Sequence, residues 1–514
     1  MNNTHYDVII IGTGAGGGTL AGRLAPSGKR ILILERGGFL PREMENWDTH
    51  AVFTEARYKA REVWHDKDDK EFHPGIHYWV GGNTKVYGAA LFRFREKDFG
   101  ELRHHGSTSP AWPISYQDLE PYYTEAERLY HVHGKRGIDP TEPPSSAPYP
   151  HPPLPHEPRI QELYDDWQRI GHRPFPLPIG VDLGTESETP APETILSHFD
   201  GFPDPTESKS DSYVRGIKPA LEHRNVTLLT ESLVERLETS ASGREITKVH
   251  VRRGAATETF SADLVVVACG AINSAALLLR SASDKHPNGL ANRSDVVGRH
   301  YMFHNNSALL ALSREPNPTK FGKTLGLNDF YFGADDWEFP LGHIQMLGKS
   351  DAEMLREDAP RFAPGMVLEQ MAKHSLDFWL TSEDLPEADN RVLLRRDGSI
   401  QINYTGNNRE AHKRLVAKLK NMLGEIGCQS MLMPCTAYLG KTIPLAGTAH
   451  QCGTIRFGTD PKTSALDVNC KAHDVDNLYV VDSSFFVSST AVNPGLTIMA
   501  NALRIGDHIK QRLG

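Results

Sequence analysis

The stretch YDVIIIGTGAGG, residues 6–17, decides the fold. Its first half, residues 6–11, is a continuous apolar run of strand length, which is typical of a central parallel strand buried on both faces. A helical pattern over residues 19–25 follows the glycines, and residues 30–34 form a second apolar run that ends in Glu35. This order of strand, loop, helix and strand predicts a βαβ unit.

Three glycines of this stretch, Gly12, Gly14 and Gly17, fit the pattern G-x-G-x-x-G between a strand and a helix. The first permits a tight turn, the second lets the backbone approach a pyrophosphate, and the third lets the helix pack closely on the strand. The helix N-terminus offers N–H groups to the phosphates, and Glu35 can accept hydrogen bonds from a ribose diol. A turn without a ligand is the alternative, but the flanking strands and helix favour dinucleotide binding.

Further pieces of the same sheet are predicted far along the chain. Residues 263–268 and 477–482 are apolar strand patterns, and a helical pattern over 274–279 follows the first of them. Residues 225–260 alternate like antiparallel strands. Since sheet segments occur at both ends and in the middle, we expect interleaved domains. The proline-rich residues 139–160 predict an extended connection, and helical patterns near 352–357 and 409–427 fall in a second domain.

Composition argues against several other classes of protein. The 514 residues carry a net charge of −9 without a cluster of Lys and Arg, which disfavours nucleic acid or an anionic membrane as a partner. Five scattered cysteines without a CxxC pair disfavour disulfides and a zinc site, so no metal is expected. No apolar run is long enough to span a bilayer, and the first residues lack a signal-peptide pattern. We therefore expect a cytoplasmic protein; its oligomeric state is left open.

A second glycine-rich loop, YWVGGNTKVYG over residues 78–88, favours FAD over a nicotinamide cofactor. A nicotinamide dehydrogenase has no evident need for such a loop at this point. A flavoprotein can use it to bring backbone N–H groups close to the flavin or the pyrophosphate. The alternative is an ordinary turn with a Gly pair.

Taken together, these motifs resemble the glucose–methanol–choline (GMC) oxidoreductase family of FAD enzymes. The resemblance runs from end to end in the family's order, through residues 6–37, 81–99, 225–237, 264–281 with 296–304, and 450–458 with 477–509. Within the family, the Asn-Pro pair at 493–494 and the segment GTIRFG look most like pyranose oxidases and bacterial glycoside 3-oxidases.

The resemblance implies an α/β fold, in which a Rossmann-like FAD-binding domain is interleaved with an α+β substrate domain. The substrate domain of such folds, which resemble p-hydroxybenzoate hydroxylase, is built on a large antiparallel sheet. The implied FAD-binding domain comprises residues 1–110, 210–300 and 445–514. The implied substrate-binding domain comprises residues 111–209 and 301–444.

The resemblance also implies which residues contact FAD. Besides the glycine loop and Glu35, Val234 matches the position whose backbone meets the adenine, and Asp482 matches a residue near the ribityl chain and pyrophosphate. Some relatives attach the flavin to a histidine where this chain has Val86, so non-covalent FAD is expected. The full expected set is Gly12, Thr13, Gly14, Ala15, Gly17, Glu35, Arg36, Gly82, Asn83, Thr84, Val234, Ala271, Asp482, Pro494 and Thr497.

Two residues near the C-terminus supply the chemistry that alcohol oxidation needs. A neutral imidazole can take the hydroxyl proton while hydride leaves the carbon for the flavin N5, and a second polar side chain can hold the substrate oxygen. His450 and Asn493 match the family's catalytic pair in these roles. A helix that begins near Pro494 is expected to point its N-terminus at the flavin. His304 is expected to be structural.

The substrate side is less determined by sequence. Residues 326–345 hold five aromatic side chains among polar ones, which predicts either a sugar site or a hairpin with an aromatic core. Gln345 matches loosely a substrate-contacting glutamine of pyranose oxidases, and Arg93 or Arg95 is a candidate to reach the same cavity.

The leading functional prediction is an oxidase of a secondary ring hydroxyl, at C3 or C2, of a pyranose sugar or glycoside. The expected products are a keto-sugar and, with O2 as acceptor, H2O2. A dehydrogenase that passes electrons to a quinone or another carrier is one alternative. A GMC oxidase of another alcohol and a catalytically silent flavin-binding protein are the others.

Overall fold

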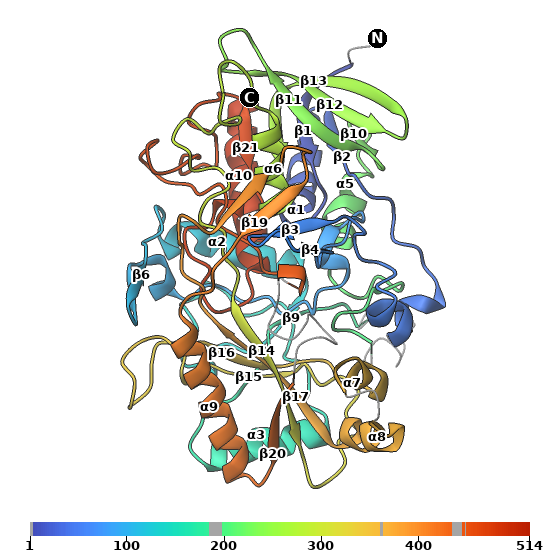
Figure 1. Ribbon diagram of the computed structural model, residues 1–514, viewed down its shortest axis with the longest axis vertical. Helices are drawn as coiled ribbons and strands as arrows, with labels where there is room; N and C mark the ends of the chain where they lie inside the picture. Colours follow the sequence, from blue (N-terminus) through green and yellow to red (C-terminus); the bar gives the residue numbers. More distant parts are fainter. Residues whose placement is uncertain (1–3, 184–197, 360–362, 434–444, 448) are drawn as a thin grey trace.

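The predicted βαβ unit forms the centre of a seven-stranded sheet (Figure 1). The structure is a computed structural model that describes residues 4–183, 198–359, 363–433, 445–447 and 449–514. Six strands follow the order β10-β2-β1-β13-β12-β11, and the seventh, β21, pairs with β13. The strands are β1 (Thr4–Ile11), β2 (Ile31–Leu34), β10 (Val226–Leu229), β11 (Leu233–Thr239), β12 (Ile246–Arg253), β13 (Ala256–Val267) and β21 (Leu478–Val480).

The parallel part of this sheet joins segments that are far apart in the chain. Val8 of β1 is paired with Ile31 of β2 on one side and with Leu264 of β13 on the other. β10 is also parallel to β2, whereas the alternating pattern predicted an antiparallel strand. β10 is an edge strand with only one fully buried residue. Its alternation of apolar and polar residues therefore indicates burial on one face and does not determine the direction of the strand.

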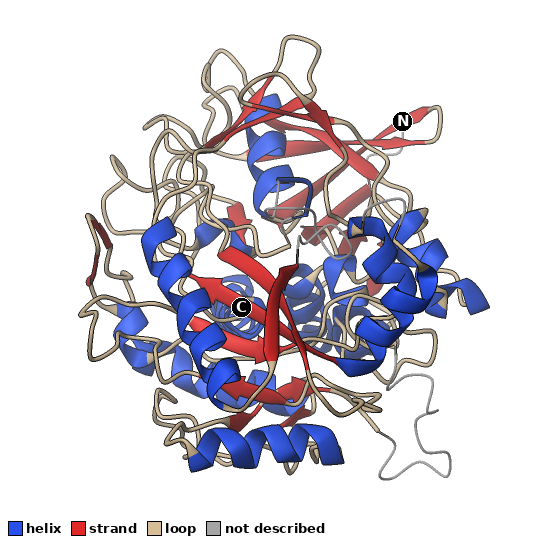
Figure 2. Cartoon of the chain, turned by 60° about the horizontal axis from the view of Figure 1, so that its bottom comes forward, coloured by secondary structure: helices blue, strands red, loops and turns tan. Residues whose placement is uncertain are grey.

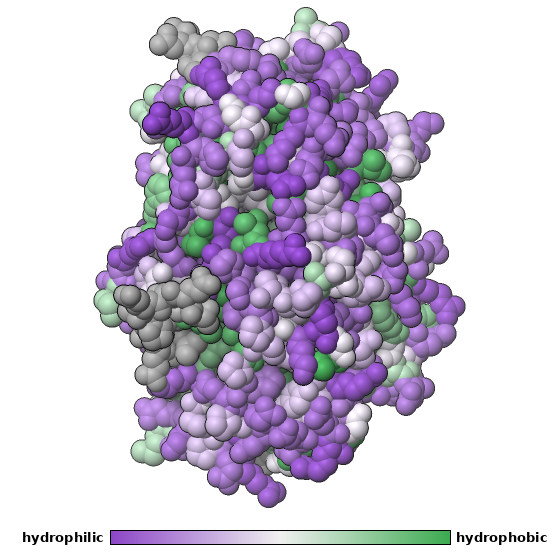
Figure 3. All heavy atoms as spheres, turned by 180° about the vertical axis from the view of Figure 1, so that it is seen from behind, coloured by the Kyte–Doolittle hydropathy of each residue, from purple (hydrophilic) through white to green (hydrophobic). Residues whose placement is uncertain are grey.

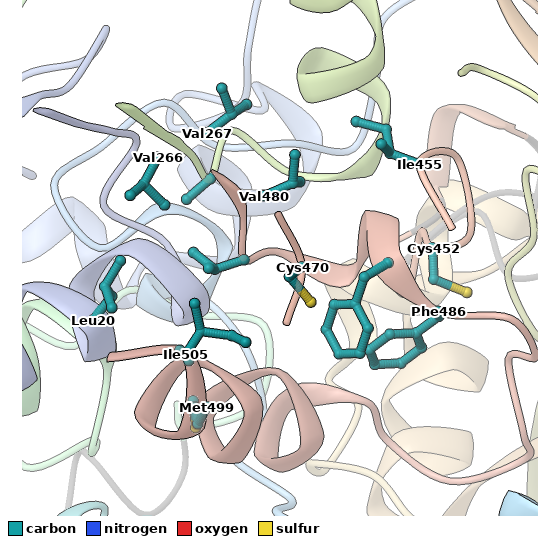
Figure 4. Packing of buried hydrophobic residues seen from close by; sticks show 14 of the residues in the cluster. Leu20, Val266, Val267, Cys452, Ile455, Cys470, Val480, Phe486, Met499 and Ile505 are labelled. Carbon is teal, nitrogen blue, oxygen red and sulfur yellow. The ribbon is translucent and has the colours of Figure 1, made fainter. Parts of the chain in front are cut away.

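Helices from both ends of the chain pack together against this sheet. α1 (Ala15–Leu24) contacts α10 (Gly495–Leu513), and α10 also contacts α2 (Tyr116–Leu129). In Figure 4, Leu20 and Ile505 lie beside Val266 and Val480, where helix side chains meet strand side chains. α6 (Ala271–Arg280) follows β13, as the sequence predicted.

A second, six-stranded antiparallel sheet lies in the lower part of the molecule in Figure 1, with helices around it in Figure 2. Its order is β20-β14-β17-β16-β15-β8. The strands are β8 (Phe175–Pro176), β14 (Asn305–Leu312), β15 (Leu325–Leu327), β16 (His343–Met346), β17 (Ser375–Ser382) and β20 (Gln429–Met433). The helices are α3 (Pro158–Arg169), α7 (Ala352–Asp358), α8 (Gly365–His374) and α9 (Arg409–Glu425), and of these α7 and α9 confirm predicted helices.

A four-stranded sheet crosses the predicted domain boundary. It joins β3 (Trp64–Asp66) and β4 (Glu71–Phe72) to β18 (Arg391–Leu394) and β19 (Ile400–Asn403). The division into two discontinuous domains therefore stays a prediction. The remaining short elements are β5 (Leu102–His104), β6 (Ser107–Ser109), β7 (Val132–His133), β9 (Ile179–Gly180) and α5 (Lys218–Ala220).

The surface seen from behind is mostly hydrophilic (Figure 3). Within the described part of the chain, no helix combines the length and the hydrophobicity that a membrane crossing requires. Four of the five cysteines are free thiols in the structure, and Cys435 lies outside the described residues.

Candidate active site

The glycine loop after β1 lines a cavity of about 200 Å³ together with the end of β2. A Cβ atom added to Gly14 would meet no atom within 4 Å, so this glycine faces open space. A Cβ added to Gly17 would lie 2.1 Å from the carbonyl oxygen of Gly12, so this glycine is required for close packing of α1 on β1. Gly14 therefore leaves room for a ligand in the cavity, and Gly17 supports the cavity wall.

Glu35 is held in a fixed orientation at the edge of this cavity. Its carboxylate accepts hydrogen bonds from the Thr13 hydroxyl at 2.6 Å and the Thr13 N–H at 3.1 Å, and from the Gly37 N–H at 2.9 Å. Burial raises the pKa of Glu35, against the lowering effect of these hydrogen bonds. Since the side chain lines the cavity, it is placed to accept hydrogen bonds from a polar ligand there.

Asp482 ties the ends of two elements together beside the same cavity. It caps the short turn after β21 by accepting the Ser484 N–H at 2.9 Å, and it also accepts the Gly270 N–H at 2.9 Å. Burial raises the pKa of this carboxyl group. Other predicted cofactor residues that line the cavity are Gly12, Thr13, Gly14, Ala15, Glu35, Arg36, Gly82, Asn83, Thr84, Val234 and Ala271.

Thr497 is not part of this lining. Its hydroxyl is buried and lies 2.7 Å from the Tyr123 hydroxyl, in the contact between α10 and α2. The side chain of Thr497 thus serves helix packing, and contact of this residue with the cofactor stays a prediction.

His450 and Asn493 line a second cavity of about 260 Å³. This cavity also includes Gln345 and Pro494, so it joins residues from β16, from the start of α10 and from the C-terminal loop. The two cavities share six lining residues, which are Ala15, His77, Asn83, Thr84, Ala449 and Ile498. They are therefore neighbouring parts of one site, with the second glycine-rich loop between them.

The imidazole of His450 is kept neutral by its surroundings. Its pKa lies well below the usual 6.5, because the ring is buried and because His304 and Lys323 are nearby cations or potential cations. The neutral form is the one that can accept a proton.

His304 packs against the ring of His450 and does not itself line the second cavity. Its Nδ1 lies 3.0 Å from the carbonyl oxygen of Thr490, and burial lowers its pKa to about 4. Its position thus agrees with a structural role.

α10 begins at Gly495, directly after Asn493 and Pro494. Its first turn contains no acidic residue, so the positive end of the helix dipole is not compensated within its own sequence. Pro494 and Gly495 line the cavity, so this helix end faces the cavity, and that it points at the flavin stays a prediction.

Gln345 is one end of a chain of polar contacts that reaches into the core. Its side chain lies 3.3 Å from Nε2 of His343, and Nδ1 of His343 lies 2.7 Å from Oδ1 of Asn328. Asn328 in turn donates to Asp139 at 2.8 Å. Burial, together with Arg95, lowers the pKa of His343 to about 3. A neutral imidazole carries one N–H, so His343 donates to one of the two amide oxygens, and the far end of the chain is the carboxylate of Asp139. These contacts hold Gln345 in position.

Arg93 is a wrong prediction for the substrate cavity. Its guanidinium makes two hydrogen bonds of 2.8 Å to Glu127 and one of 3.0 Å to Glu120, and it does not line either cavity. Arg95 is likewise paired, at 2.6 Å, with Asp139. Both guanidinium groups thus form ion pairs with buried carboxylates. These partners are distant in sequence, so the residues around Arg93 do not predict them.

The aromatic run in residues 326–345 also lies elsewhere. Tyr331 is buried and donates to Asp98 at 2.9 Å, whereas Trp337 packs beside Arg414, whose Cζ is 3.9 Å from the ring centroid. None of its five aromatic residues lines the second cavity, and of the five only Tyr331 is fully buried, so the segment forms neither an aromatic sugar site in this cavity nor a fully buried aromatic core. Trp379 of β17, the direct cross-strand partner of Gln345, does line the second cavity, together with the aromatic residues Phe53, Tyr58 and Tyr87.

Sequence reasoning assigned no role to eight polar or aromatic residues that line the second cavity. They are Phe53, Tyr58, Lys59, His77, Tyr87, Asp200, Lys323 and Trp379. His77 precedes the second glycine-rich loop and Tyr87 belongs to it, which was the available signal for these two. The other six come from segments without a recognisable motif.

Comparisons with known proteins decide the family. Models of the GMC oxidoreductase N- and C-terminal regions match residues 189–306 and 386–502. The chain is 30% identical to 6'''-hydroxyparomomycin C oxidase of Streptomyces lividus, over 99% of this chain and 92% of the relative. The chain belongs to the GMC oxidoreductase family. GMC oxidoreductases bind FAD and act on CH–OH groups of sugars or other alcohols, so this chain is an FAD-dependent enzyme of that class.

Other relatives extend the same result. Paromamine 6'-oxidase of Streptomyces fradiae is 29% identical, over 97% of this chain and 90% of the relative. 2-Methyl-1,2-propanediol dehydrogenase of Mycolicibacterium austroafricanum is 28% identical, over 98% and 95%. Among solved structures, pyridoxine 4-oxidase from Mesorbium loti has a TM-score of 0.69 at 19% identity, covering 98% of this chain and 99% of that one. These matches confirm the predicted fold class.

The residues of the first cavity fit FAD. Gly14 leaves open space beside the N-terminus of α1, and Glu35 contributes an oriented carboxylate to the cavity lining. The second glycine loop, with Asn83 and Thr84, stands between this cavity and the one that holds His450. We expect the dinucleotide part in the first cavity and the flavin ring at the junction. Within the described residues, no group of three or more His, Cys, Asp or Glu side chains could hold a metal ion.

Proposed function

We propose that this GMC oxidoreductase oxidises a secondary ring hydroxyl, at C3 or C2, of a pyranose sugar or glycoside. The product is a keto-sugar, and O2 is the proposed electron acceptor with H2O2 as its product. The observation that carries the proposal is the cavity that combines His450 and Asn493 with Gln345 and Trp379. A cytoplasmic location stays a prediction.

His450 and Asn493 divide the work on the reacting hydroxyl. Neutral His450 takes the proton from the hydroxyl oxygen, and the Asn493 amide donates a hydrogen bond to that oxygen as negative charge develops on it. When bound, FAD supplies the acceptor for the hydride that leaves the same carbon. Burial strengthens the hydrogen bond from Asn493, because water competes less for the oxygen in a cavity than in solution.

The wall formed by Gln345 and Trp379 suits a sugar ring. The two residues are cross-strand neighbours, so their side chains leave the same face of the sheet. An indole ring can cover the apolar C–H face of a pyranose, while the amide bonds to a hydroxyl at its edge. A substrate without both kinds of surface would leave one of these groups unused.

A primary hydroxyl of an amino sugar is a second candidate, favoured by the relatives. Two of them are named as oxidases of aminoglycosides, one at position 6'. In this chain, the cavity contains a carboxylate, Asp200, which an ammonium group of such a substrate could approach. Because Lys323 already pairs with Asp200 at 2.7 Å, we rank this candidate second.

Electron transfer to a quinone or another carrier is the alternative to O2. A relative named as the large subunit of fructose dehydrogenase, from Gluconobacter japonicus, is 26% identical over 98% of this chain. Turnover measured in parallel with O2 and with a quinone or dye distinguishes the two acceptors. Substrate and acceptor are independent parts of the proposal.

We also propose that FAD is bound without a covalent link, since Val86 offers no nucleophile at the position where some family members attach it. Denaturation with acid tests this directly. The yellow colour is expected in the supernatant, and colour retained by the precipitate would contradict it.

The proposed substrate class is tested by anaerobic mixing of the holoenzyme with a panel of glycosides, free sugars, amino sugars and primary alcohols. Bleaching of the flavin by glycosides, with a ring ketone found by NMR of the product, is expected. Bleaching by amino sugars with an aldehyde product would select the second candidate. No bleaching by any member of the panel would contradict both.

A further inference from the structure

An ion pair lies in the wall of the substrate cavity. Nζ of Lys323 lies 2.7 Å from Oδ2 of Asp200, and both residues line the cavity that contains His450, Asn493 and Gln345. The two side chains are only 5% and 11% exposed. The pair is therefore enclosed in the same space as the reacting groups.

Burial of such a pair is costly unless its remaining hydrogen-bonding capacity is used. Removing an ammonium and a carboxylate from water costs several kcal/mol per ion, and the mutual attraction of the ions offsets this only with good geometry. The ammonium has three N–H donors, of which one is directed at Asp200, and a carboxylate can accept about four hydrogen bonds. The pair thus presents a donor and an acceptor side by side to whatever fills the cavity.

The positive charge of Lys323 affects the pKa of His450, the proposed catalytic base. Lys323 contributes, after burial and His304, to the lowered pKa of His450. It also contributes to the lowered pKa of His343, which contacts Gln345. The ammonium group is therefore near both the reacting group and the glutamine that faces the ring.

We propose that Lys323 and Asp200 together bind hydroxyl groups on the carbons next to the oxidised carbon, and so select ring positions with a vicinal hydroxyl. This inference rests on the proposed function. Adjacent ring hydroxyls are both donors and acceptors, and their oxygens are separated by about a hydrogen-bond length, which matches a paired ammonium and carboxylate. A primary hydroxyl has only one carbon neighbour and cannot present this pattern on both sides.

Gly88 gives a way to displace the pair without removing either charge. A Cβ added to Gly88 would lie 2.2 Å from Oδ1 of Asp200 and 2.4 Å from Nζ of Lys323. Gly88 belongs to the second glycine-rich loop and lines the second cavity together with Asp200 and Lys323. Gly88→Ala should therefore shift the two side chain ends while both remain present and paired.

The test compares methyl glucopyranoside with its 2-, 3-, 4- and 6-deoxy forms, by anaerobic flavin reduction of the holoenzyme. For the wild-type enzyme, loss of the reacting hydroxyl should abolish reduction. Loss of a neighbouring hydroxyl should lower kcat/KM about tenfold or more, because a hydrogen bond to a charged group is lost. The 6-deoxy form should react nearly as well as the parent.

Three variants are tested, Lys323→Met, Asp200→Asn and the double variant. In each, kcat/KM for the parent glucoside should fall to the value that the wild-type enzyme shows with the deoxy form lacking the bound hydroxyl. The difference between parent and deoxy form should then disappear. Gly88→Ala should reduce the same difference while it retains the FAD absorbance spectrum. The double variant keeps the test informative if either single variant fails to fold with an unpaired buried charge.

Equal sensitivity to the deoxy substitution in wild-type and folded variants would overturn the proposal. The proposal would also be overturned if, in the wild-type enzyme, only loss of the reacting hydroxyl lowered kcat/KM and loss of its neighbours did not. Failure of the wild-type enzyme to oxidise any glucoside would instead contradict the proposed function, and with it this assignment.

Discussion

The imidazole rings of His304 and His450 meet edge to face, with centroids 4.9 Å apart and an interplanar angle of 87°. Because His304 is itself held by Thr490, it is a fixed neighbour and not a mobile one. A proton on either ring disfavours a proton on the other, which helps to keep His450 neutral. This contact thus connects a residue of the core with the proposed chemistry.

Replacement of His450 by Ala should lower the rate of flavin reduction by about 10²- to 10⁴-fold, the usual contribution of a general base. FAD should stay bound, because His450 does not line the nucleotide cavity. Anaerobic stopped-flow spectroscopy measures both properties. A control is His412→Asn, which alters another histidine with a pKa lowered to about 4 that lines neither cavity and is hydrogen-bonded to Ser307 and Ser382. Near-normal turnover of His450→Ala would refute the role as base.

The pH dependence of kcat/KM should report the depressed pKa of His450. A base with a lowered pKa stays deprotonated as pH falls through 6.5, so activity should decline only at distinctly lower pH. Lys323→Met removes a nearby positive charge, raises this pKa and should move the acid limb to higher pH. An acid limb at or above pH 6.5 in the wild-type enzyme, or a shift in the other direction, would contradict this assignment.

Substitution of Gly14 and of Gly17, two glycines of one loop, should affect different properties of the protein. Gly14→Ala places a methyl group in open space that we assign to FAD, so the protein should fold but bind FAD more weakly. Gly17→Ala forces a Cβ to within 2.1 Å of the Gly12 carbonyl oxygen, so it should lower thermal stability even of the apoprotein. Thermal unfolding and FAD titration separate the two effects. Equal FAD affinity in Gly14→Ala and the wild type would argue against the cofactor position.

Substitution of Gln345 should affect substrate binding, whereas substitution of Arg93 should affect the stability of the fold. Gln345→Ala should raise KM for a glycoside about tenfold, since it removes a hydrogen bond in the cavity. Arg93→Met should leave KM unchanged but lower the free energy of unfolding, because it removes one of the two guanidinium partners of the buried carboxylate of Glu127 and leaves only Arg136. Steady-state kinetics and chemical denaturation measure these changes. A raised KM in stable Arg93→Met would restore the original prediction for that arginine.

The parts of the structure that sequence could predict are those encoded locally. The strand, the glycines and Glu35 lie within one βαβ unit, so spacing alone defined the nucleotide end. His450 and Asn493 were found only through the family's motif order. Lys323, Asp200 and Trp379 were not found, because each derives its role from long-range packing.

The wrong predictions have the same origin. Arg93 has the right residue type for a cavity, but Glu127 of α2 neutralises it. The strand direction of β10 depends on its partner β2, nearly two hundred residues earlier in the chain, and one-sided burial does not encode it. Sequence patterns indicate burial and turns. The partners that a residue or strand meets across the fold are known only from the structure.

The central claim is that a secondary ring C–H bond breaks beside His450 and Asn493. The most direct test is the rate of anaerobic flavin reduction with methyl glucopyranoside deuterated at C2, at C3 or at both C6 positions. We predict slower reduction with deuterium at C3 or C2, and an unchanged rate with deuterium at C6. Slower reduction with the C6-deuterated substrate alone would show that the primary hydroxyl reacts and would contradict the account.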